Sequence, residues 1–285
     1  MKVLVLGGNG MAGHVLRMYF TEKGRYSVWF TLRAKTEDRQ AIQLDVTDWP
    51  SVEKVARFIR PDVVINTTGI LNKRAEQNIR EAIQVNSLFP HQMAQLGKQL
   101  GFRFIQISTD CVFSGRKGNY RESETPDGTT VYAKSKSLGE VVDGPHLTIR
   151  TSIIGPELRD GIGLFHWFMQ QKGSILGYRK VLWNGVTTLE LAKALDWIMQ
   201  KPELTGLVHL TGPEKISKYQ LLLWLKETFK REEVSIQPYD GIAKDMSLVN
   251  TRPDFTYVAL PYIQALEEMR DWIRCHDGYR YPMAG

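Results

Sequence analysis

Tyr132 and Lys136 stand four residues apart in the segment TTVYAKSKSLGE, and their side chains are chemically complementary. If the segment is helical, the two side chains share one face, whereas Lys134 points away from the tyrosine. A free phenol has a pKa of about 10, so an adjacent ammonium would ease its deprotonation and let it exchange protons with a substrate. The same spacing is also typical of an exposed helix with scattered lysines, so the pair depends on its surroundings for support.

A glycine cluster near the start of the chain is a second candidate site. The segment KVLVLGGNGMAGHVLRMYF combines an apolar run, the spacing GxxGxxG at Gly7, Gly10 and Gly13, and a helical pattern from Met11 onward. In a dinucleotide-binding turn, such glycines allow positive φ, close approach of the backbone to a pyrophosphate, and close packing of helix on strand. The free N–H groups at the helix N-terminus attract the pyrophosphate. The segment therefore predicts a dinucleotide site.

The next apolar segment, YSVWFTL, indicates which dinucleotide is bound. NAD enzymes usually carry Asp or Glu after this strand to hold the ribose 2′-hydroxyl, but here Arg33 and Lys35 follow. A guanidinium can bind the 2′-phosphate of NADP, so NADPH is the expected cofactor. The alternative is that Arg33 is a solvated loop residue and that Glu37 or Asp38 serves the ribose instead.

These residues must be positioned by a sheet, and the chain has the pattern for one. Apolar segments alternate with helical patterns over the first 150 residues, which predicts an α/β fold with a doubly wound parallel (Rossmann) sheet. In such a sheet, ligands bind at the carboxyl ends of the strands. The residues expected at those ends are Asp45, Val46, Thr67, Thr68, Gly69 and Thr109.

Composition and charge narrow the class of protein. The 285 residues are 42% hydrophobic and 24% charged, with a net charge of +6 that favours anionic ligands. No basic block, recognition helix or Cys/His finger supports nucleic-acid binding, and the two cysteines, Cys111 and Cys275, suggest neither a disulfide framework nor a metal site. No signal sequence or membrane span is expected, so the predicted location is the cytoplasm.

The ordered set GGNGMAG, STDCVFSG and VYAKSKSLGE resembles the extended short-chain dehydrogenases/reductases. Within them, the last two motifs, followed by TIRTSIIGPE, resemble the dTDP-4-dehydrorhamnose reductase branch. The resemblance implies a catalytic triad of Thr109, Tyr132 and Lys136. Thr109 would hold the sugar oxygen, Tyr132 would protonate the alkoxide formed by hydride transfer from NADPH, and Lys136 would also bind the nicotinamide ribose. The implied function is reduction of the 4-keto group of a nucleotide-linked 6-deoxy-4-ketohexose in polysaccharide precursor biosynthesis.

Departures from that branch concern the sugar side. Cys111 stands where tyrosine is common, and Ile153 and Ile154 stand where the branch often has tryptophan. If these positions line the sugar side, the pocket is roomier and less aromatic, and Cys111 contacts substrate. The motifs STDCVFSGRKGNY and RTSIIGPEL look closer to relatives that act on UDP-N-acetylhexosamine derivatives. We therefore expect a UDP-linked 2-acetamido-2,6-dideoxy-4-ketohexose rather than a dTDP sugar.

The resemblance also implies a small C-terminal substrate-binding lobe. We expect a cofactor domain at 1–150 with a returning segment at about 181–211, and a lobe formed by 151–180 and 212–285. Arg252, in a loop stiffened by Pro253, is the preferred candidate for binding the sugar diphosphate. Further candidates for the diphosphate are Lys172, Arg179 and Lys180. The aromatic residues Phe165, Trp167 and Phe168 either face a nucleotide base or belong to the core.

Two other functions stay open at this point. One is a nucleotide-sugar epimerase with tightly bound NAD, against which Arg33 and the missing acid argue. The other is a binding role without catalysis, since a eukaryotic relative of these reductases is the regulatory subunit of methionine adenosyltransferase. An intact Thr109, Tyr132 and Lys136 argue against that role. The protein could also form a homodimer.

Overall fold

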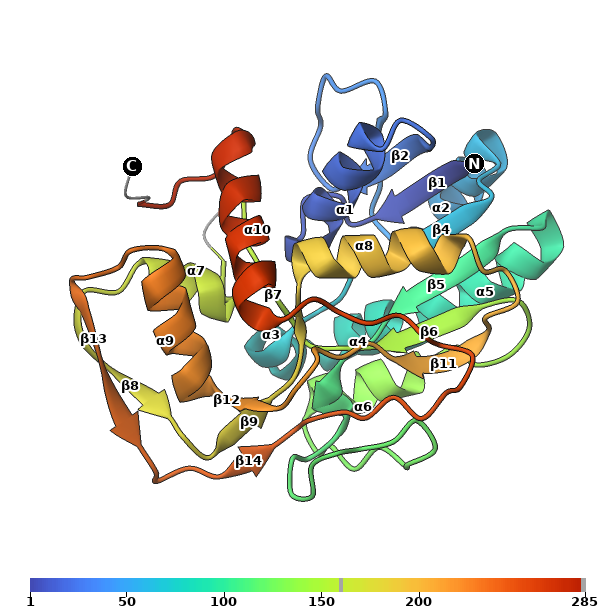
Figure 1. Cartoon of the computed structure of the whole chain (residues 1–285). Helices are drawn as coiled ribbons and strands as arrows, with labels where there is room; N and C mark the ends of the chain where they lie inside the picture. The colour runs from blue at the N-terminus through green and yellow to red at the C-terminus, as the bar shows by residue number, and fades with distance from the viewer. Residues whose placement is uncertain (159–160, 283–285) are drawn as a thin grey trace.

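A parallel seven-stranded sheet forms the centre of the computed structural model, which describes residues 1–158 and 161–282 (Figure 1). All neighbouring strands pair in parallel, so their carboxyl ends lie along one edge. The predicted doubly wound sheet is thereby confirmed. In spatial order the strands are β11 (Gly206–His209), β6 (Leu147–Arg150), β5 (Arg103–Ile107), β4 (Val63–Asn66), β1 (Lys2–Leu6), β2 (Ser27–Leu32) and β3 (Ala41–Gln43).

The direction in which strands are added reverses between β1 and β4. The chain builds outward from β1 to β2 and β3, and then crosses back to add β4, β5, β6 and β11 on the other side. Loops that leave β1 and β4 therefore run to opposite sides of the sheet, which opens a crevice at their carboxyl ends.

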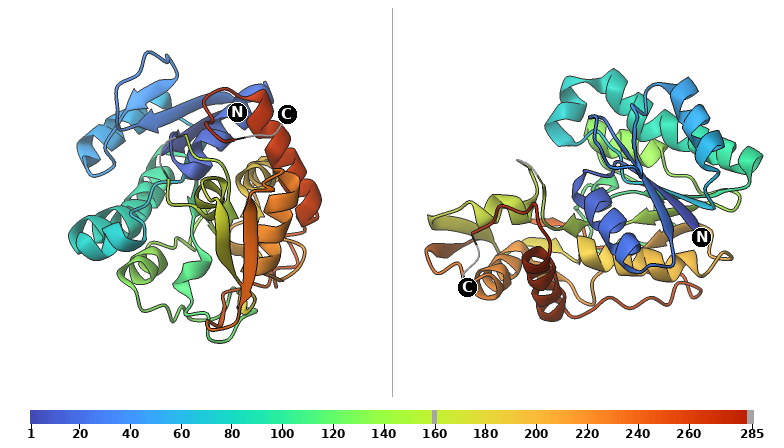
Figure 2. Two further views of the ribbon diagram at one scale, coloured as in Figure 1. Left: turned by 90° about the vertical axis from the view of Figure 1, so that its left-hand side faces the viewer. Right: turned by 90° about the horizontal axis from the view of Figure 1, so that it is seen from above.

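Helices cover both faces of the sheet, as Figures 1 and 2 show. On one face, α1 (Met11–Glu22) and α8 (Thr188–Met199) bury apolar side chains against alternate strand residues such as Val3 and Val5. On the other, α2 (Trp49–Ile59) and α5 (Phe89–Leu100) pack against Leu4 and Leu6. The helix starts follow local signals, because Asp48 caps α2 and Thr187 caps α8.

Short helices lie at the carboxyl edge of the sheet. They are α3 (Asn72–Gln77), α4 (Ile79–Ala82), η1 (Ile83–Leu88), η2 (Asp110–Val112) and α6 (Val131–Leu138). Buried polar contacts hold α6 against η1: Asn86 Nδ2 donates to Ser135 Oγ at 3.0 Å, and Ser87 Oγ donates to the Ser135 carbonyl at 2.8 Å. These contacts set the position of the helix that carries Tyr132 and Lys136.

A smaller lobe with its own core stands beside the sheet (Figure 1). The bounds of the expected lobe and its role in binding substrate stay predictions. The core alternative is correct for Phe165 and Phe168, which are fully buried, whereas Trp167 is 38% exposed. The elements of this part of the chain are β7 (Ile153–Ile154), α7 (Leu164–Met169), β8 (Gly173–Tyr178), β9 (Val181–Trp183), β10 (Val186–Thr187), β12 (Ile216–Ser217), α9 (Lys218–Thr228), β13 (Val234–Tyr239), β14 (Lys244–Asp245) and α10 (Tyr262–Cys275).

Candidate active site

The glycine turn between β1 and α1 is built for close approach. Gly7 has a φ of 86°, which a residue with a side chain rarely adopts. A Cβ at Gly13 would lie 2.1 Å from the Gly7 carbonyl oxygen, so only glycine lets α1 pack this near the turn. Gly10 precedes Met11 at the start of α1, and no side chain caps the helix there. The first N–H groups of α1 are therefore open to an anionic group.

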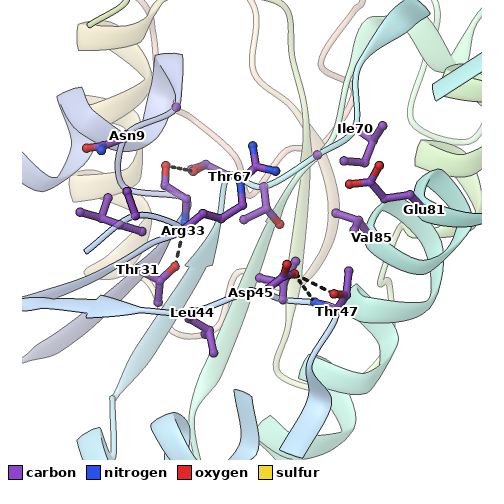
Figure 3. Close-up of a pocket in the computed structure, with 17 residues that line it drawn as sticks. Asn9, Thr31, Arg33, Leu44, Asp45, Thr47, Thr67, Ile70, Glu81 and Val85 are labelled. Carbon is purple, nitrogen blue, oxygen red and sulfur yellow. Dashed lines mark hydrogen bonds between the residues drawn. The ribbon is translucent and has the colours of Figure 1, made fainter. Parts of the chain in front are cut away.

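A cavity opens beside this turn at the carboxyl ends of β1, β2 and β4 (Figure 3). It brings together eight residues that the sequence predicted for the cofactor: Gly7, Gly10, Arg33, Asp45, Val46, Thr67, Thr68 and Gly69. The other lining residues were not predicted from the sequence. They end β2, follow β1, β2, β3 or β4, or lie on α4 and η1: Asn9, Thr31, Leu32, Ala34, Leu44, Thr47, Ile70, Glu81 and Val85.

Hydroxyl groups order the walls of this cavity. The Gly7 N–H donates to Thr31 Oγ1 at 3.1 Å, and Thr67 Oγ1 donates to the Leu6 carbonyl at 2.6 Å. Asp45 accepts hydrogen bonds from the Thr47 N–H and hydroxyl, which lower the pKa of the carboxyl group, with a smaller effect from nearby Arg33. Asp45 is therefore a fixed anion that lines the cavity together with Arg33, and both side chains are exposed (Figure 3).

The acids that were considered as alternatives to Arg33 do not enter this cavity. Asp38 accepts a hydrogen bond from the Gln40 N–H at 2.9 Å and lines a small neighbouring cavity together with Arg17 and Lys35. Glu37 is exposed and lines neither cavity. Arg33 is thus the charged residue that the end of β2 presents to the cavity.

Thr109 and Tyr132 meet at the carboxyl end of β5. Thr109 caps η2 by accepting a hydrogen bond from the Cys111 N–H at 3.1 Å. Burial raises the pKa of Tyr132 above its usual range, and Cys111 and Asp110 add to the rise, while a hydrogen bond with Thr109 opposes it. The phenol is therefore protonated at neutral pH and able to give a proton rather than take one.

Lys136 is buried on the same helix face as Tyr132, while Lys134 is exposed. Its Nζ donates to the Ile107 carbonyl at 2.7 Å. Burial lowers the pKa of Lys136 to about 8, against the opposing charge of Glu140. The ammonium is thus held at the end of β5. That it makes Tyr132 easier to deprotonate stays a prediction.

On the other side of Thr109 lie Cys111 and a cluster that the sequence argument missed. Cys111 is half-buried, and burial followed by the charge of Asp110 raises the pKa of its thiol to about 12. Asp110 is buried and hydrogen-bonded to Ser152, whose Oγ also accepts from Trp183 Nε1 at 2.8 Å. Trp183 therefore places an indole near the position expected to lack aromatic residues.

Ile153 and Ile154 form β7, which pairs with β10. Ile154 is buried in the core of the lobe, and Ile153 packs against the core of the larger part. Packing against these two cores argues against a place for Ile153 and Ile154 in the wall of a roomier, less aromatic pocket, and that pocket stays a prediction at Cys111.

Arg252 does not lie in this site. Its Nε and Nη2 bind Asp254, and its Nη1 donates to the carbonyls of Thr205 and Leu207 at 3.0 and 3.1 Å. These carbonyls flank the start of β11, at the edge of the sheet opposite the strand ends that carry Thr109. The role of Arg252 with the sugar diphosphate stays a prediction, and its guanidinium here ties the loop of residues 250–254 to the sheet.

A second cavity is strongly basic and is lined in part by the loop that follows Cys111. Ser114 and Gly115, close after Cys111 in the chain, form one wall of it. Its charged lining residues are Arg116, Arg179, Lys180, Lys244 and Asp245. Arg179 pairs with Asp240, and the charge of Lys244 reaches Cys111, where it lowers the pKa of the thiol slightly. This cavity can take an anionic group attached to a substrate at the catalytic residues.

Residues 1–158 and 161–282 contain neither a candidate metal site nor a candidate membrane span. No group of three or more His, Cys, Asp or Glu side chains in these ranges could hold a metal ion. Within the same part of the chain, no helix combines the length and the apolar character that crossing a membrane requires.

Comparisons with known proteins agree with the geometry. The family model of the RmlD substrate binding domain matches residues 1–161. The spore coat polysaccharide biosynthesis protein SpsK of Bacillus subtilis is 29% identical over 141 residues, which cover 49% of this chain and 47% of SpsK. The chain thus spans about half the length of that relative. The dTDP-4-dehydrorhamnose reductase of Aggregatibacter actinomycetemcomitans is 25% identical over 234 residues, 78% of this chain and 77% of the relative.

Solved structures show the same fold. The crystal structure of dTDP-4-dehydrorhamnose reductase from Bacillus anthracis in complex with NADP has a TM-score of 0.79 and 19% identity, covering 94% of this chain and 98% of that one.

Proposed function

The chain belongs to the RmlD substrate binding domain family, and we propose on this premise that it reduces the 4-keto group of a nucleotide-linked 6-deoxy-4-ketohexose with NADPH. One observation carries the proposal. Thr109, Tyr132 and Lys136 gather at the end of β5, on the same sheet edge as the glycine turn and its cavity. The relative from Aggregatibacter, named as a reductase of such a sugar, supports the reaction.

Residues of the first cavity fit a dinucleotide phosphate. Gly13 lets α1 pack close to the glycine turn, and the uncapped N-terminus of α1 would face the pyrophosphate. Arg33 would bind the 2′-phosphate, while Thr67, Thr68 and Gly69 line the opposite wall. The NADP complex of the structural relative from Bacillus anthracis supports this choice of cofactor.

The catalytic residues would then act in sequence on the sugar. NADPH supplies a hydride to the keto carbon when it is bound. Thr109 holds the sugar oxygen by a hydrogen bond, and Tyr132 donates its proton to that oxygen as negative charge develops there. Because burial keeps the phenol protonated, Tyr132 is ready for the reductive direction. Lys136, anchored on the Ile107 carbonyl, would donate to the ribose next to the nicotinamide.

We further propose that the basic cavity takes the sugar diphosphate in place of Arg252. Lys180, Lys244 and Arg116 supply positive charge, and the charge of Lys244 reaches Cys111, two residues after Thr109. Cys111 stands where the related reductases commonly have the larger tyrosine, which would leave room for a 2-acetamido group. A UDP-linked 2-acetamido-2,6-dideoxy-4-ketohexose therefore remains the preferred substrate. Such a reduction belongs to polysaccharide precursor biosynthesis, and the name of SpsK supports that setting.

The cytoplasm is the proposed location, supported by two cysteines that are both free thiols. The homodimer stays a prediction, which light scattering of the purified protein would test.

The experiment that tests the function is a panel of dTDP- and UDP-linked 4-ketosugars offered with NADPH and followed by absorbance at 340 nm. We expect oxidation of NADPH with at least one of these ketosugars, and a kcat/KM that is about tenfold higher for the UDP-acetamido sugar. A faster reaction with the dTDP sugar at limiting substrate would overturn the substrate preference. Epimerisation without consumption of NADPH would replace the proposed reductase with the epimerase alternative.

A further inference from the structure

Lys218 is a cation near Asp110 and Cys111, and the proposed reaction does not use it. It is the first residue of α9, it is half-buried, and its Nζ lies 4.4 Å from the centre of the Trp183 ring. Among residues 1–158 and 161–282, no oxygen accepts a hydrogen bond from this Nζ. An ammonium in this position therefore has N–H donors available for a ligand.

A continuous set of contacts joins Lys218 to the catalytic threonine. Trp183, which lies under the ammonium, donates its indole N–H to Ser152, and Ser152 is hydrogen-bonded to Asp110. Asp110 Oδ1 lies 3.2 Å from Thr109 Oγ1. The charge of Lys218 acts on Asp110, and in turn both Asp110 and Cys111 favour its charged form. Lys218 thus lies on the side of Thr109 that carries Asp110 and Cys111.

The charge next to Lys218 indicates which group it can bind. Burial lowers the pKa of Lys218 to about 8, and the neighbouring Asp110 opposes that change. Asp110 would partly offset the positive charge and repel an anion, so a neutral oxygen acceptor is favoured over a phosphate. The diphosphate has its own cations in the basic cavity around Lys180 and Lys244. The remaining acceptors near the reacting carbon are oxygens on the sugar itself.

We propose that Lys218 is a substrate-recognition residue, which donates a hydrogen bond to an oxygen carried by the sugar ring near the reacting carbonyl. This inference rests on the proposed reductase function and goes beyond it by assigning a specificity residue outside Thr109, Tyr132 and Lys136. Trp183 and Ser152 are positioning residues for the ammonium. A hydroxyl or an acetamido carbonyl is the class of acceptor that fits.

The test compares Lys218→Met, Lys218→Arg and the control Lys226→Met with the unmodified protein. Lys218→Met keeps an unbranched apolar stem over Trp183, and Lys226 lies on the same helix α9. For each protein, kcat and KM are measured with the most active ketosugar of the panel at saturating NADPH. The Kd of the free nucleoside diphosphate with the same base is measured by calorimetry.

We expect Lys218→Met to lower kcat/KM by about 10- to 100-fold, mainly through KM, because a hydrogen bond from a charged donor is lost. The Kd of the nucleoside diphosphate should change by less than about twofold, which also shows that the variant is folded. Lys218→Arg should recover at least about a fifth of the kcat/KM, and Lys226→Met should match the unmodified protein.

Two results would overturn the inference while the reductase function stands. An equal loss of affinity for the nucleoside diphosphate would show that Lys218 binds the diphosphate instead. An unchanged kcat/KM in Lys218→Met would show that it does not touch the substrate. If none of the 4-ketosugars in the panel leads the unmodified protein to oxidise NADPH, the proposed function fails, and the inference fails with it.

Discussion

Lys136 Nζ donates a hydrogen bond to the main-chain carbonyl of Ile107 over a distance of 2.7 Å. Ile107 ends β5, and Thr109 follows two residues later, while Lys136 lies one helical turn after Tyr132 on α6. A single buried bond therefore ties the helix that carries the phenol to the strand end that carries the hydroxyl. Together with the contacts of Asn86 and Ser87 with Ser135, it sets the relative position of Thr109 and Tyr132.

Replacing Lys136 by Met should lower kcat by about 10²-fold or more and weaken NADPH binding by about tenfold, because both the anchor and the donor to the ribose are lost. Stopped-flow turnover and fluorescence titration of NADPH measure the two effects. Lys134→Met is the matched control, since Lys134 is exposed on the same helix and should leave both values unchanged. Equal effects of the two substitutions would contradict the assignment.

Tyr132→Phe should lower kcat by about 10²- to 10⁴-fold and leave the Kd of NADPH within about twofold, because the phenol donates the proton but does not hold the cofactor phosphates. Steady-state kinetics and a cofactor titration on the same preparation check both parts. A variant with normal turnover would mean that another group supplies the proton.

Arg33→Ala should raise the Kd of NADPH by about 10- to 100-fold and change that of NADH by less than about twofold, since only NADPH carries the 2′-phosphate. Arg39, exposed in the same loop, provides the control Arg39→Ala, which should preserve the preference. Equal affinities of the unmodified protein for NADPH and NADH would refute the role of Arg33.

Gly13→Ala should destabilise the protein by about 1 to 3 kcal/mol, because the new Cβ would lie 2.1 Å from the Gly7 carbonyl oxygen and force α1 away from the turn. Gly10→Ala is the comparison, since a Cβ there would lie 3.3 Å from the same oxygen and should cost less than about 1 kcal/mol. Urea unfolding gives both free energies. A smaller loss for Gly13→Ala than for Gly10→Ala would contradict the packing argument.

Acid should destabilise the fold through His14. This histidine is fully buried between the Gly10 carbonyl and the Tyr279 hydroxyl, and burial lowers its pKa to about 4. In the unfolded chain the pKa of His14 is higher, about 6.5, so the unfolded chain binds the proton first as the pH falls. The contribution of His14 to the free energy of unfolding is therefore fully present above about pH 6.5 and is lost as the pH falls toward 4.

Between pH 7.5 and 5.0, His14 should account for a loss of about 2 kcal/mol in the free energy of unfolding. His14→Gln should remove that part of the pH dependence, as urea unfolding at the two values would show. His209 contributes to the pH dependence that remains in this variant, because burial also lowers the pKa of His209 to about 4. A variant with the same loss between the two pH values as the unmodified protein would show that His14 does not bind a proton on unfolding.

The residues close together in the chain were placed correctly from their spacing. Gly7 and Gly13 are separated by one turn and the start of a helix, so their packing follows from local geometry. The same holds for Tyr132 and Lys136, because the helical repeat alone puts them on one face and leaves Lys134 in solvent. The ends of apolar segments likewise located Thr67 and Thr109, since parallel strands finish at one edge.

The substrate side was decided by tertiary structure. Four residues meet there from separate elements, and no periodic pattern relates their positions in the chain: Lys218 from α9, Trp183 from β9, Ser152 from between β6 and β7, and Asp110 from η2. They meet because the lobe packs against the sheet edge, and the free energy of that packing is spread over its buried core. Arg252 shows the converse: a basic residue in a stiff loop was a reasonable candidate, but its partners, the carbonyls of Thr205 and Leu207, become neighbours only when β11 returns to the sheet. Local spacing encodes which residues share a face, whereas contacts between distant segments depend on how those faces pack together.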